Sequence, residues 1–286
     1  MSLFDPRRAA QVRSTTESLC ELFRENANRL FFRETVKRQP DIGAGRPGEE
    51  AQRRTRLASS DSGRAVTSEV DLVLLGYWWD GGVAYTCSAA ERSLLRIVSH
   101  SAWVRGAVQK ENAWRLKGRQ QEFMDLLRAA QRIRQAVDAT SQMERLARMI
   151  SLCTPNLPID RAFPPEHAEG QMVALLMETE QPPEGPVDLY LTRSPCRHCA
   201  NGFARLRKLH DMYHDITTQN PQAYKGARRS EYDQFRNDYE DAGFDRWKIG
   251  WILYGAPYEN RENQTDWAAL DRAVRNGSVS GHRRLY

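Results

Sequence analysis

The sequence lacks the long apolar runs that mark membrane-spanning and secreted chains. No stretch of its 286 residues approaches the roughly eighteen consecutive apolar residues of a transmembrane helix. Residues 1–8, which read MSLFDPRR, lack the apolar segment of a secretory signal. These absences predict a cytoplasmic protein with no membrane partner, or one exported by a route that needs no amino-terminal signal.

Cysteine is scarce, and its pattern does not suit a disulfide framework. The chain has five cysteines, an odd number, at positions 20, 87, 153, 196 and 199. Two of them, Cys196 and Cys199, form a C-x-x-C pair. In a chain of this length such usage predicts reduced thiols and metal binding rather than stapled loops.

Positive charges exceed negative charges only slightly. The chain has 42 Lys and Arg against 37 Asp and Glu, which leaves a net charge of +5. Because 40% of the residues are hydrophobic and 28% are charged, the composition excludes fibrous and disordered classes and is typical of a globular protein. The small positive excess mildly favours a polyanionic partner.

The residue pattern of the amino-terminal half divides it into three parts. Residues 1–37 have the mixed apolar and polar pattern of a helical segment. Residues 38–69 are rich in Pro, Gly and Ser and predict a flexible linker or loop. A third part, 70–286, begins with a predicted β-hairpin, in which Asp80-Gly81-Gly82 forms the turn before a returning strand at 83–87.

Helical spacing dominates the region 88–153, and a core of about 155–286 follows it. In this core we expect helices beginning near His167 and near Pro195, and a third around Trp267. Strands are predicted at 187–192 and 247–254, with a polar, aromatic-rich connection between them. In the second strand, period-two alternation predicts one shared face for Trp247, Ile249, Trp251 and Leu253.

Two short motifs open two of the predicted helices. The first is His167-Ala168-Glu169, and the second is Pro195-Cys196-Arg197-His198-Cys199. Two thiolates and one imidazole form a three-ligand Zn²⁺ site that leaves the fourth tetrahedral position to water, whose pKa the metal lowers to about 7. Glu169 follows the histidine too closely to be an easy ligand, but it can accept the water proton and deliver protons to a substrate.

The ordered pair H-x-E and P-C-x-x-C resembles the signature of the zinc-dependent cytidine deaminase-like superfamily of nucleobase deaminases. The resemblance implies His167, Cys196 and Cys199 as zinc ligands and Glu169 as the acid and base. It also implies an α/β fold, a three-layer α/β/α sandwich with a mixed central sheet of about five strands. The helical amino-terminal extension is similar to toxin-type and fungal-type branches, and residues 70–286 form the expected deaminase domain.

The substrate implied by the resemblance is a cytosine. Ser194-Pro195-Cys196 is similar to the S-P-C run of cytosine-type deaminases. In the superfamily, a helix after strand 247–254 goes with a parallel last strand, which is found in enzymes acting on nucleic acids and on some free bases. We therefore expect zinc-bound hydroxide to convert cytosine to uracil in single-stranded DNA or RNA. The expected substrate contacts are Ala168, Arg193, Ser194 and Pro195, with Arg193 near a phosphate.

Several alternatives remain open from the sequence. A free nucleoside, nucleotide or base is the second substrate class, and a non-catalytic zinc module for interaction or nucleic-acid binding is a different class. A zinc finger would combine the two cysteines with His210 and His214, although its central spacing is short. Further candidate substrate contacts lie in polar connections, namely Tyr224, Tyr232, Tyr239 and Tyr258. The superfamily places two strands directly before the H-x-E helix, whereas the predicted hairpin here ends far upstream, at Cys87.

Overall fold

The computed structural model divides the chain into two compact units. The first consists of Met1–Thr16, Val73–Ala89 and Ile133–Tyr286, and the second of Glu17–Leu72 and Ala90–Arg132. The residues that the structure describes are 4–37, 73–88, 139–154, 162–224, 226, 228–258 and 264–285. The predicted linker 38–69 and most of the predicted helical region 88–153 therefore lie outside the described residues.

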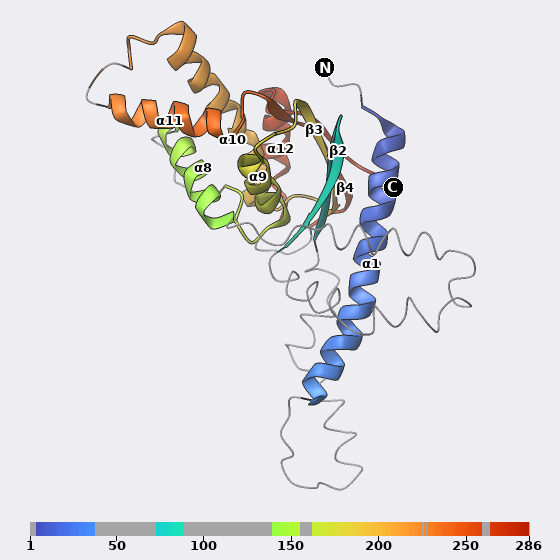
Figure 1. Ribbon diagram of the computed structural model, residues 1–286. Helices are drawn as coiled ribbons and strands as arrows, with labels where there is room; N and C mark the ends of the chain where they lie inside the picture. The colour runs from blue at the N-terminus through green and yellow to red at the C-terminus, as the bar shows by residue number, and fades with distance from the viewer. Residues whose placement is uncertain are drawn as a thin grey trace, which may run out of the picture. The chain divides into compact units, whose positions relative to one another are not determined.

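A mixed five-stranded sheet forms the centre of the first unit (Figure 1). Its strands are β1 (Leu74–Trp79), β2 (Gly82–Cys87), β3 (Gly185–Arg193), β4 (Trp247–Ala256) and β5 (Val279–Arg284). They lie in the order β2-β1-β3-β4-β5. The strand β1 is antiparallel to β2 and β3, whereas β3, β4 and β5 are parallel. The predicted α/β class with a mixed sheet is confirmed.

The predicted hairpin is present and forms one edge of this sheet. Asp80 and Gly81 make the turn, and Trp79 pairs with Gly82 across it. A Cβ on Gly82 would lie 2.9 Å from the Trp79 ring, so the tight return of the chain depends on a residue without a side chain. The hairpin is thus part of the sheet despite its distance in sequence from the H-x-E helix.

Helices cover one face of the sheet. They are α8 (Ala139–Cys153), α9 (Ala168–Glu178), α10 (Arg197–His214), α11 (Arg229–Asp241) and α12 (Trp267–Arg275), with the short π-helix η2 (Asp215–Gln219) after α10. The α10 helix contacts α8, α11 and α12, while α9 contacts β1 and β2. Apolar side chains of α9 and α10 pack with those of β3, including Val187, Leu189 and Leu191, in the main core. Burial of this apolar surface is the dominant favourable contribution to folding.

The first turns of α1 (Pro6–Lys37) cover the opposite face. A Cβ on Gly76 of β1 would lie 2.6 Å from Val12 and 2.7 Å from Thr16, so the helix approaches the strand closely because Gly76 has no side chain. The Phe4 ring meets the edge of Trp251 with centroids 5.4 Å apart. The guanidinium of Arg283 in β5 lies 4.0 Å from the centroid of the same Phe4 ring. The sheet therefore has helical layers on both sides.

A bulge in β4 changes which side chains face the core. The side-chain Oδ1 of Asp188 accepts the Trp251 N–H at 2.7 Å, and a Cβ on Gly250 would lie 2.0 Å from that oxygen. The pairing shifts register here, and the core residues of β4 are Trp247, Ile249, Ile252 and Tyr254. The predicted shared face of Trp247, Ile249, Trp251 and Leu253 is therefore wrong beyond Ile249, because the bulge inserts one residue into the alternation.

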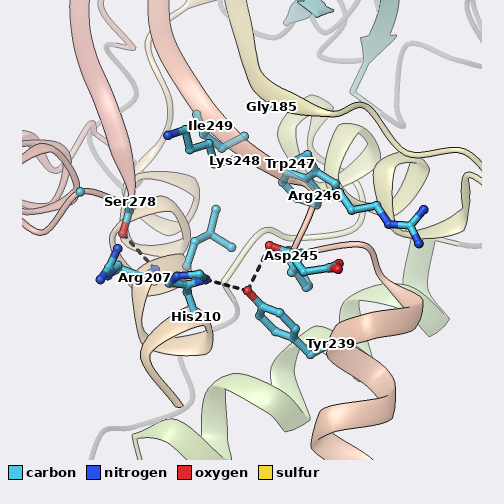
Figure 2. A pocket seen from close by; sticks show the side chains of 13 residues that line it. Gly185, Arg207, His210, Tyr239, Asp245, Arg246, Trp247, Lys248, Ile249 and Ser278 are labelled. Carbon is cyan, nitrogen blue, oxygen red and sulfur yellow. Dashed lines mark hydrogen bonds between the residues drawn. The ribbon is translucent and has the colours of Figure 1, made fainter. Parts of the chain in front are cut away.

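The predicted polar connection between β3 and β4 contains a helix. Residues 229–241 form α11, which buries Phe235 and Tyr239. The Tyr239 hydroxyl lies 3.0 Å from Nδ1 of His210 in α10 and donates to the Phe244 carbonyl at 3.0 Å (Figure 2). These contacts attach α11 to the end of α10. Within the described ranges, no helix is both long enough and apolar enough to cross a lipid bilayer.

Candidate metal centre

The loop that carries His167 is held in place by close packing. Phe163 adopts a positive φ of 54° and is fully buried, with its ring 4.9 Å from that of Phe203. A Cβ on Gly202 would lie 2.7 Å from the Phe163 ring, and one on Gly170 would lie 2.1 Å from the Pro164 carbonyl. The two glycines thus let the loop lie directly against the first turns of α9 and α10.

The loop that carries Cys196 is held by hydrogen bonds from Ser194. The Ser194 hydroxyl lies 2.6 Å from that of Thr265 and accepts the Tyr258 N–H at 2.9 Å. The backbone N–H of Ser194 donates to the Ala256 carbonyl at 2.8 Å. Since β3 and β4 are neighbouring parallel strands, these bonds fix the chain leaving β3 against the chain leaving β4. Cys196 follows two residues later, as the N-cap of α10.

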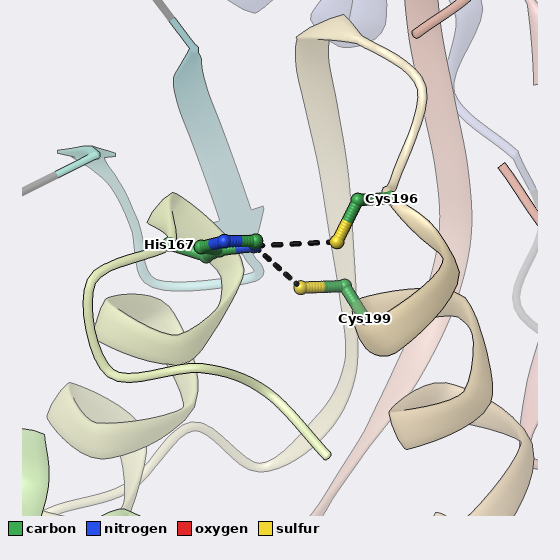
Figure 3. A group of neighbouring side chains, drawn as sticks. All are labelled: His167, Cys196 and Cys199. Carbon is green, nitrogen blue, oxygen red and sulfur yellow. Dashed lines mark hydrogen bonds between the residues drawn. The ribbon is translucent and has the colours of Figure 1, made fainter. Parts of the chain in front are cut away.

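His167, Cys196 and Cys199 converge at the adjacent beginnings of α9 and α10 (Figure 3). Nδ1 of His167 lies 3.3 Å from Sγ of Cys196 and 3.5 Å from Sγ of Cys199. Their ligand atoms all lie within 4.8 Å of one another, so the group can hold a metal ion. The structure therefore brings together the three residues that the motifs single out.

The three groups of this centre perturb one another strongly. Burial opposes the charged imidazole, but the hydrogen bond and charge of Cys196 outweigh it and raise the pKa of His167 to about 9. The hydrogen bond from Cys199, aided by His167 and opposed by burial, lowers the pKa of Cys196 to about 4. Burial raises the pKa of Cys199. A thiolate at Cys196 is further favoured by its position at a helix amino terminus.

Glu169 is the buried carboxyl beside this group. It lies in the first turn of α9 and is 3% exposed. Burial and then the charge of Cys196 raise the pKa of Glu169 to about 7, against the opposing charge of His167 and a hydrogen bond with Cys199. A carboxyl group whose pKa lies near neutrality can both accept and donate a proton, which is what general acid and base catalysis needs.

The residues predicted to contact substrate surround the same loops. Ala168 is fully buried at the start of α9, and Pro195 is buried before Cys196. The Ser194 side chain is 2% exposed and makes the bonds to Thr265 and Tyr258 described above. Arg193 is partly exposed at the end of β3, opposite Ala256 of β4. All four therefore lie next to the metal-binding residues, near the carboxyl end of β3.

The zinc-finger histidines lie at the other end of α10. His210 and His214 are both exposed, and neither belongs to the group of potential metal ligands. Of the candidate tyrosines, Tyr239 is 1% exposed and packs in the core, so its assignment to substrate contacts is wrong. Tyr224 contacts Asp215 and Tyr232 beyond the end of α10. Tyr258 lies beside the loops of the metal centre, since its N–H donates to Ser194.

Three supporting residues were not predicted from the sequence. The Thr86 hydroxyl of β2 donates to the Ala168 carbonyl at 2.9 Å and ties the first turn of α9 to the hairpin. Thr265 anchors Ser194, and the Gln171 amide donates to the Pro165 carbonyl. Thr86 and Thr265 lie 82 and 71 residues from their partners, so no local pattern could reveal them.

Comparisons of the chain with protein-family models, with curated proteins and with solved structures found no match.

Proposed function

We propose that the protein is a zinc-dependent hydrolytic deaminase of the cytidine deaminase-like superfamily that converts cytosine to uracil in single-stranded nucleic acid. The observation that carries this proposal is the position of Glu169, a buried carboxyl in the first turn of α9, directly beside the His167, Cys196 and Cys199 group. A purely structural metal site has no need of a buried carboxyl at this point, because burying one is costly.

The donor set and its spacing fit zinc. Zinc binds cysteine sulfur at about 2.3 Å and histidine nitrogen at about 2.0 to 2.1 Å in tetrahedral geometry, which places sulfur and nitrogen about 3.5 Å apart. The distances from His167 Nδ1 to the two sulfurs are 3.3 Å and 3.5 Å. Three protein ligands leave one tetrahedral position open, the arrangement typical of catalytic rather than structural zinc.

The residues of the chain would share the chemistry as follows. When bound, zinc supplies the Lewis acidity that makes water a nucleophile at neutral pH. Glu169 takes a proton from the attacking water and delivers a proton to N3 of the ring as the new C4–O bond forms. It then moves the second proton to the exocyclic amine, so that the C4–N4 bond breaks and ammonia leaves. The result is a carbonyl at C4, which is uracil.

The topology supports a substrate that is part of a nucleic acid. The last strand, β5, pairs in parallel with β4, and α12 connects the two strands in the sequence. By the resemblance above, a parallel last strand goes with enzymes that act on nucleic acids and with some that act on free bases. Trp267, at the start of α12, is 41% exposed and follows two residues after Thr265, the partner of Ser194. An exposed ring near the centre can stack on a base that neighbours the reacting one.

The decisive experiment measures ammonia release by zinc-loaded protein offered single-stranded DNA, RNA, cytidine and adenosine in parallel. Changing Glu169 to Gln should lower turnover by about 10²- to 10⁴-fold while bound zinc and the melting temperature are kept. Glu166→Gln is the matched control, because Glu166 is exposed and only three residues away, and it should keep full turnover. Zinc-loaded protein without Glu169-dependent release from any substrate would overturn the proposal.

The same assay separates the substrate classes. Turnover of a polymer should fall steeply with salt, because phosphate contacts release counterions, whereas turnover of cytidine should hardly change. Faster turnover of cytidine than of either polymer would replace the nucleic acid with a free nucleoside. If Glu169→Gln has no effect and zinc removal unfolds the protein, the centre is a structural zinc module.

A further inference from the structure

A hollow lies at the opposite end of the parallel strands from the metal centre (Figure 2). It has a volume of about 410 Å³, within the range of small-molecule sites. Gly185 and Trp247, the first residues of β3 and β4, line it together with Ser278, just before β5, and the second half of α10. Cys196, by contrast, follows the last residues of β3. No residue is shared by the two sites.

The lining of the hollow has more positive than negative charge. Arg207, Arg246 and Lys248 stand against the single carboxyl of Asp245. Figure 2 shows the charged ends of Arg207 and Lys248 on the same side as Ser278, while those of Arg246 and Asp245 lie on the other. Nε of Arg207 is held by Asp211 at 2.7 Å. Within the described residues, the Lys248 amine has neither a hydrogen bond nor an ion pair, and it is exposed.

His210 presents a hydrogen-bond acceptor to this hollow. The hydroxyl proton of Tyr239 is donated to the Phe244 carbonyl, so the Tyr239 oxygen can only accept from Nδ1–H of His210, 3.0 Å away. This arrangement leaves the lone pair of the neutral imidazole on Nε2. Burial and then the positive charge of Arg207 lower the pKa of His210, with Lys248 acting in the same direction. The lowered pKa favours the neutral imidazole.

Apolar side chains form the remaining wall. Leu206 comes from α10, Phe244 from the turn before β4, and Trp247 and Ile249 from β4 itself. The rings of Phe244 and Trp247 are 4.9 Å apart. A ligand suited to this lining has an anionic group for the cations, a hydroxyl or N–H for Nε2, and a less polar body for the wall.

We propose that this hollow, which we call the Arg207–Lys248 pocket, is a binding site for a small phosphate ester. Arg207 and Lys248 contact the phosphate, and Nε2 of His210 accepts a hydrogen bond from a hydroxyl or N–H of the ligand. Phosphate suits the pair because its several oxygens can engage the arginine fork and the lysine point charge together. The site is separate from the metal centre, and the inference does not depend on the proposed deaminase activity.

The test uses the full chain and a matched pair of probes, ribose 5-phosphate and ribose, in isothermal titration calorimetry. Neither probe contains a nucleobase, so neither is a substrate of the proposed deamination, and the two proposals fail separately. Ribose 5-phosphate should bind saturably with one site per chain, and ribose at least about tenfold more weakly. Absence of saturable binding, or equal binding of the two probes, would overturn the phosphate-ester site.

Variants locate the binding. Lys248→Ala and His210→Asn should each weaken ribose 5-phosphate binding about tenfold, because each removes a direct contact. Asn can still donate to Tyr239, so His210→Asn removes mainly the acceptor at Nε2. Lys208→Ala is the matched control, since Lys208 is an exposed lysine of α10 outside the lining. This variant should bind ribose 5-phosphate with unchanged affinity. Equal weakening by Lys208→Ala and Lys248→Ala, with unchanged melting temperatures, would contradict the assignment.

Discussion

The two ends of the parallel strands are built from different kinds of side chain. At the carboxyl end, Glu169, Cys196 and Cys199 are at most 3% exposed. At the amino end, Arg207 and Lys248 are long and exposed. Buried side chains lose their rotamer freedom when the chain folds, so the surrounding packing holds them in place before any ligand binds. Long side chains adapt to a ligand but must lose conformational entropy to do so.

Mutations at the two ends of the strands should therefore have different effects. The metal centre depends on close backbone approaches at Gly170 and Gly202 and on the bonds of Ser194. Changes there should therefore alter both stability and metal binding. The Arg207–Lys248 pocket depends on charge, so changes there should alter ligand affinity and pH dependence with little effect on folding.

The largest effect is expected from Cys199→Ala. Loss of one of the three proposed ligands should lower zinc affinity by more than about a hundredfold, since even indirect changes around zinc ligands cost 10- to 100-fold. Zinc content after equilibrium dialysis measures this loss. Cys87→Ala is the control, because Cys87 is equally buried in β2 but lies outside the group, and it should keep its zinc. Equal zinc retention by both variants would sink the assignment of the ligands.

A smaller but still severe effect is expected from Gly170→Ala. The new Cβ would lie 2.1 Å from the Pro164 carbonyl, a backbone atom that cannot move without displacing the His167 loop. We expect a loss of about 1–3 kcal/mol of unfolding free energy in urea denaturation, together with weaker zinc binding. Gly226→Ala has open space around its Cβ and should be close to neutral. A neutral Gly170→Ala would show that this end of the sheet is not closely packed.

Ser194→Ala should cost about 1–2 kcal/mol, because the partly buried Tyr258 N–H and the buried Thr265 hydroxyl each lose a partner. A double-mutant cycle with Thr265→Val measures the shared part. The two changes should be less than additive, since either one breaks the same bond. Strict additivity would mean that the two hydroxyls do not interact.

The smallest expected effect is a change in the pH dependence of stability, caused by His210 near the amino end of the parallel strands. The pKa of His210 is lowered by partial desolvation of its imidazole and by Arg207, so the folded protein binds this proton less readily than the unfolded chain does. Stability should therefore fall as the pH drops from the unfolded value of about 6.5 through the lowered folded pKa. His210→Asn should remove this part of the decline in urea midpoints measured between pH 7 and 5. An unchanged pH profile would show that His210 does not titrate in this way.

The sequence predicted the parts of the fold that depend on neighbours in the chain. Asp80-Gly81-Gly82 contains the turn chemistry of the hairpin, and the two motifs alone single out His167, Cys196 and Cys199 as the metal-binding group. The beginnings of α9 and α10 follow from the same two motifs.

The missed parts depend on residues distant in sequence. The bulge at Gly250 arises from Asp188 on β3, and no pattern within β4 contains that information. The strand β5 has the polar sequence VSGHRR and is a strand because it pairs with β4. The α11 helix has few apolar residues, and its buried Phe235 and Tyr239 are too few to reveal helical periodicity.

The stacking of Arg283 on Phe4 has a consequence for how the chain is made. Phe4 is near the beginning of the 286 residues, and both ring partners, Trp251 and Arg283, are near the end. At translation rates of roughly 5–20 residues per second, Phe4 is made about 15 to 60 s before Trp251 and Arg283. The contact of the Phe4 ring with its two partners therefore forms only after β4 and β5 have both been made.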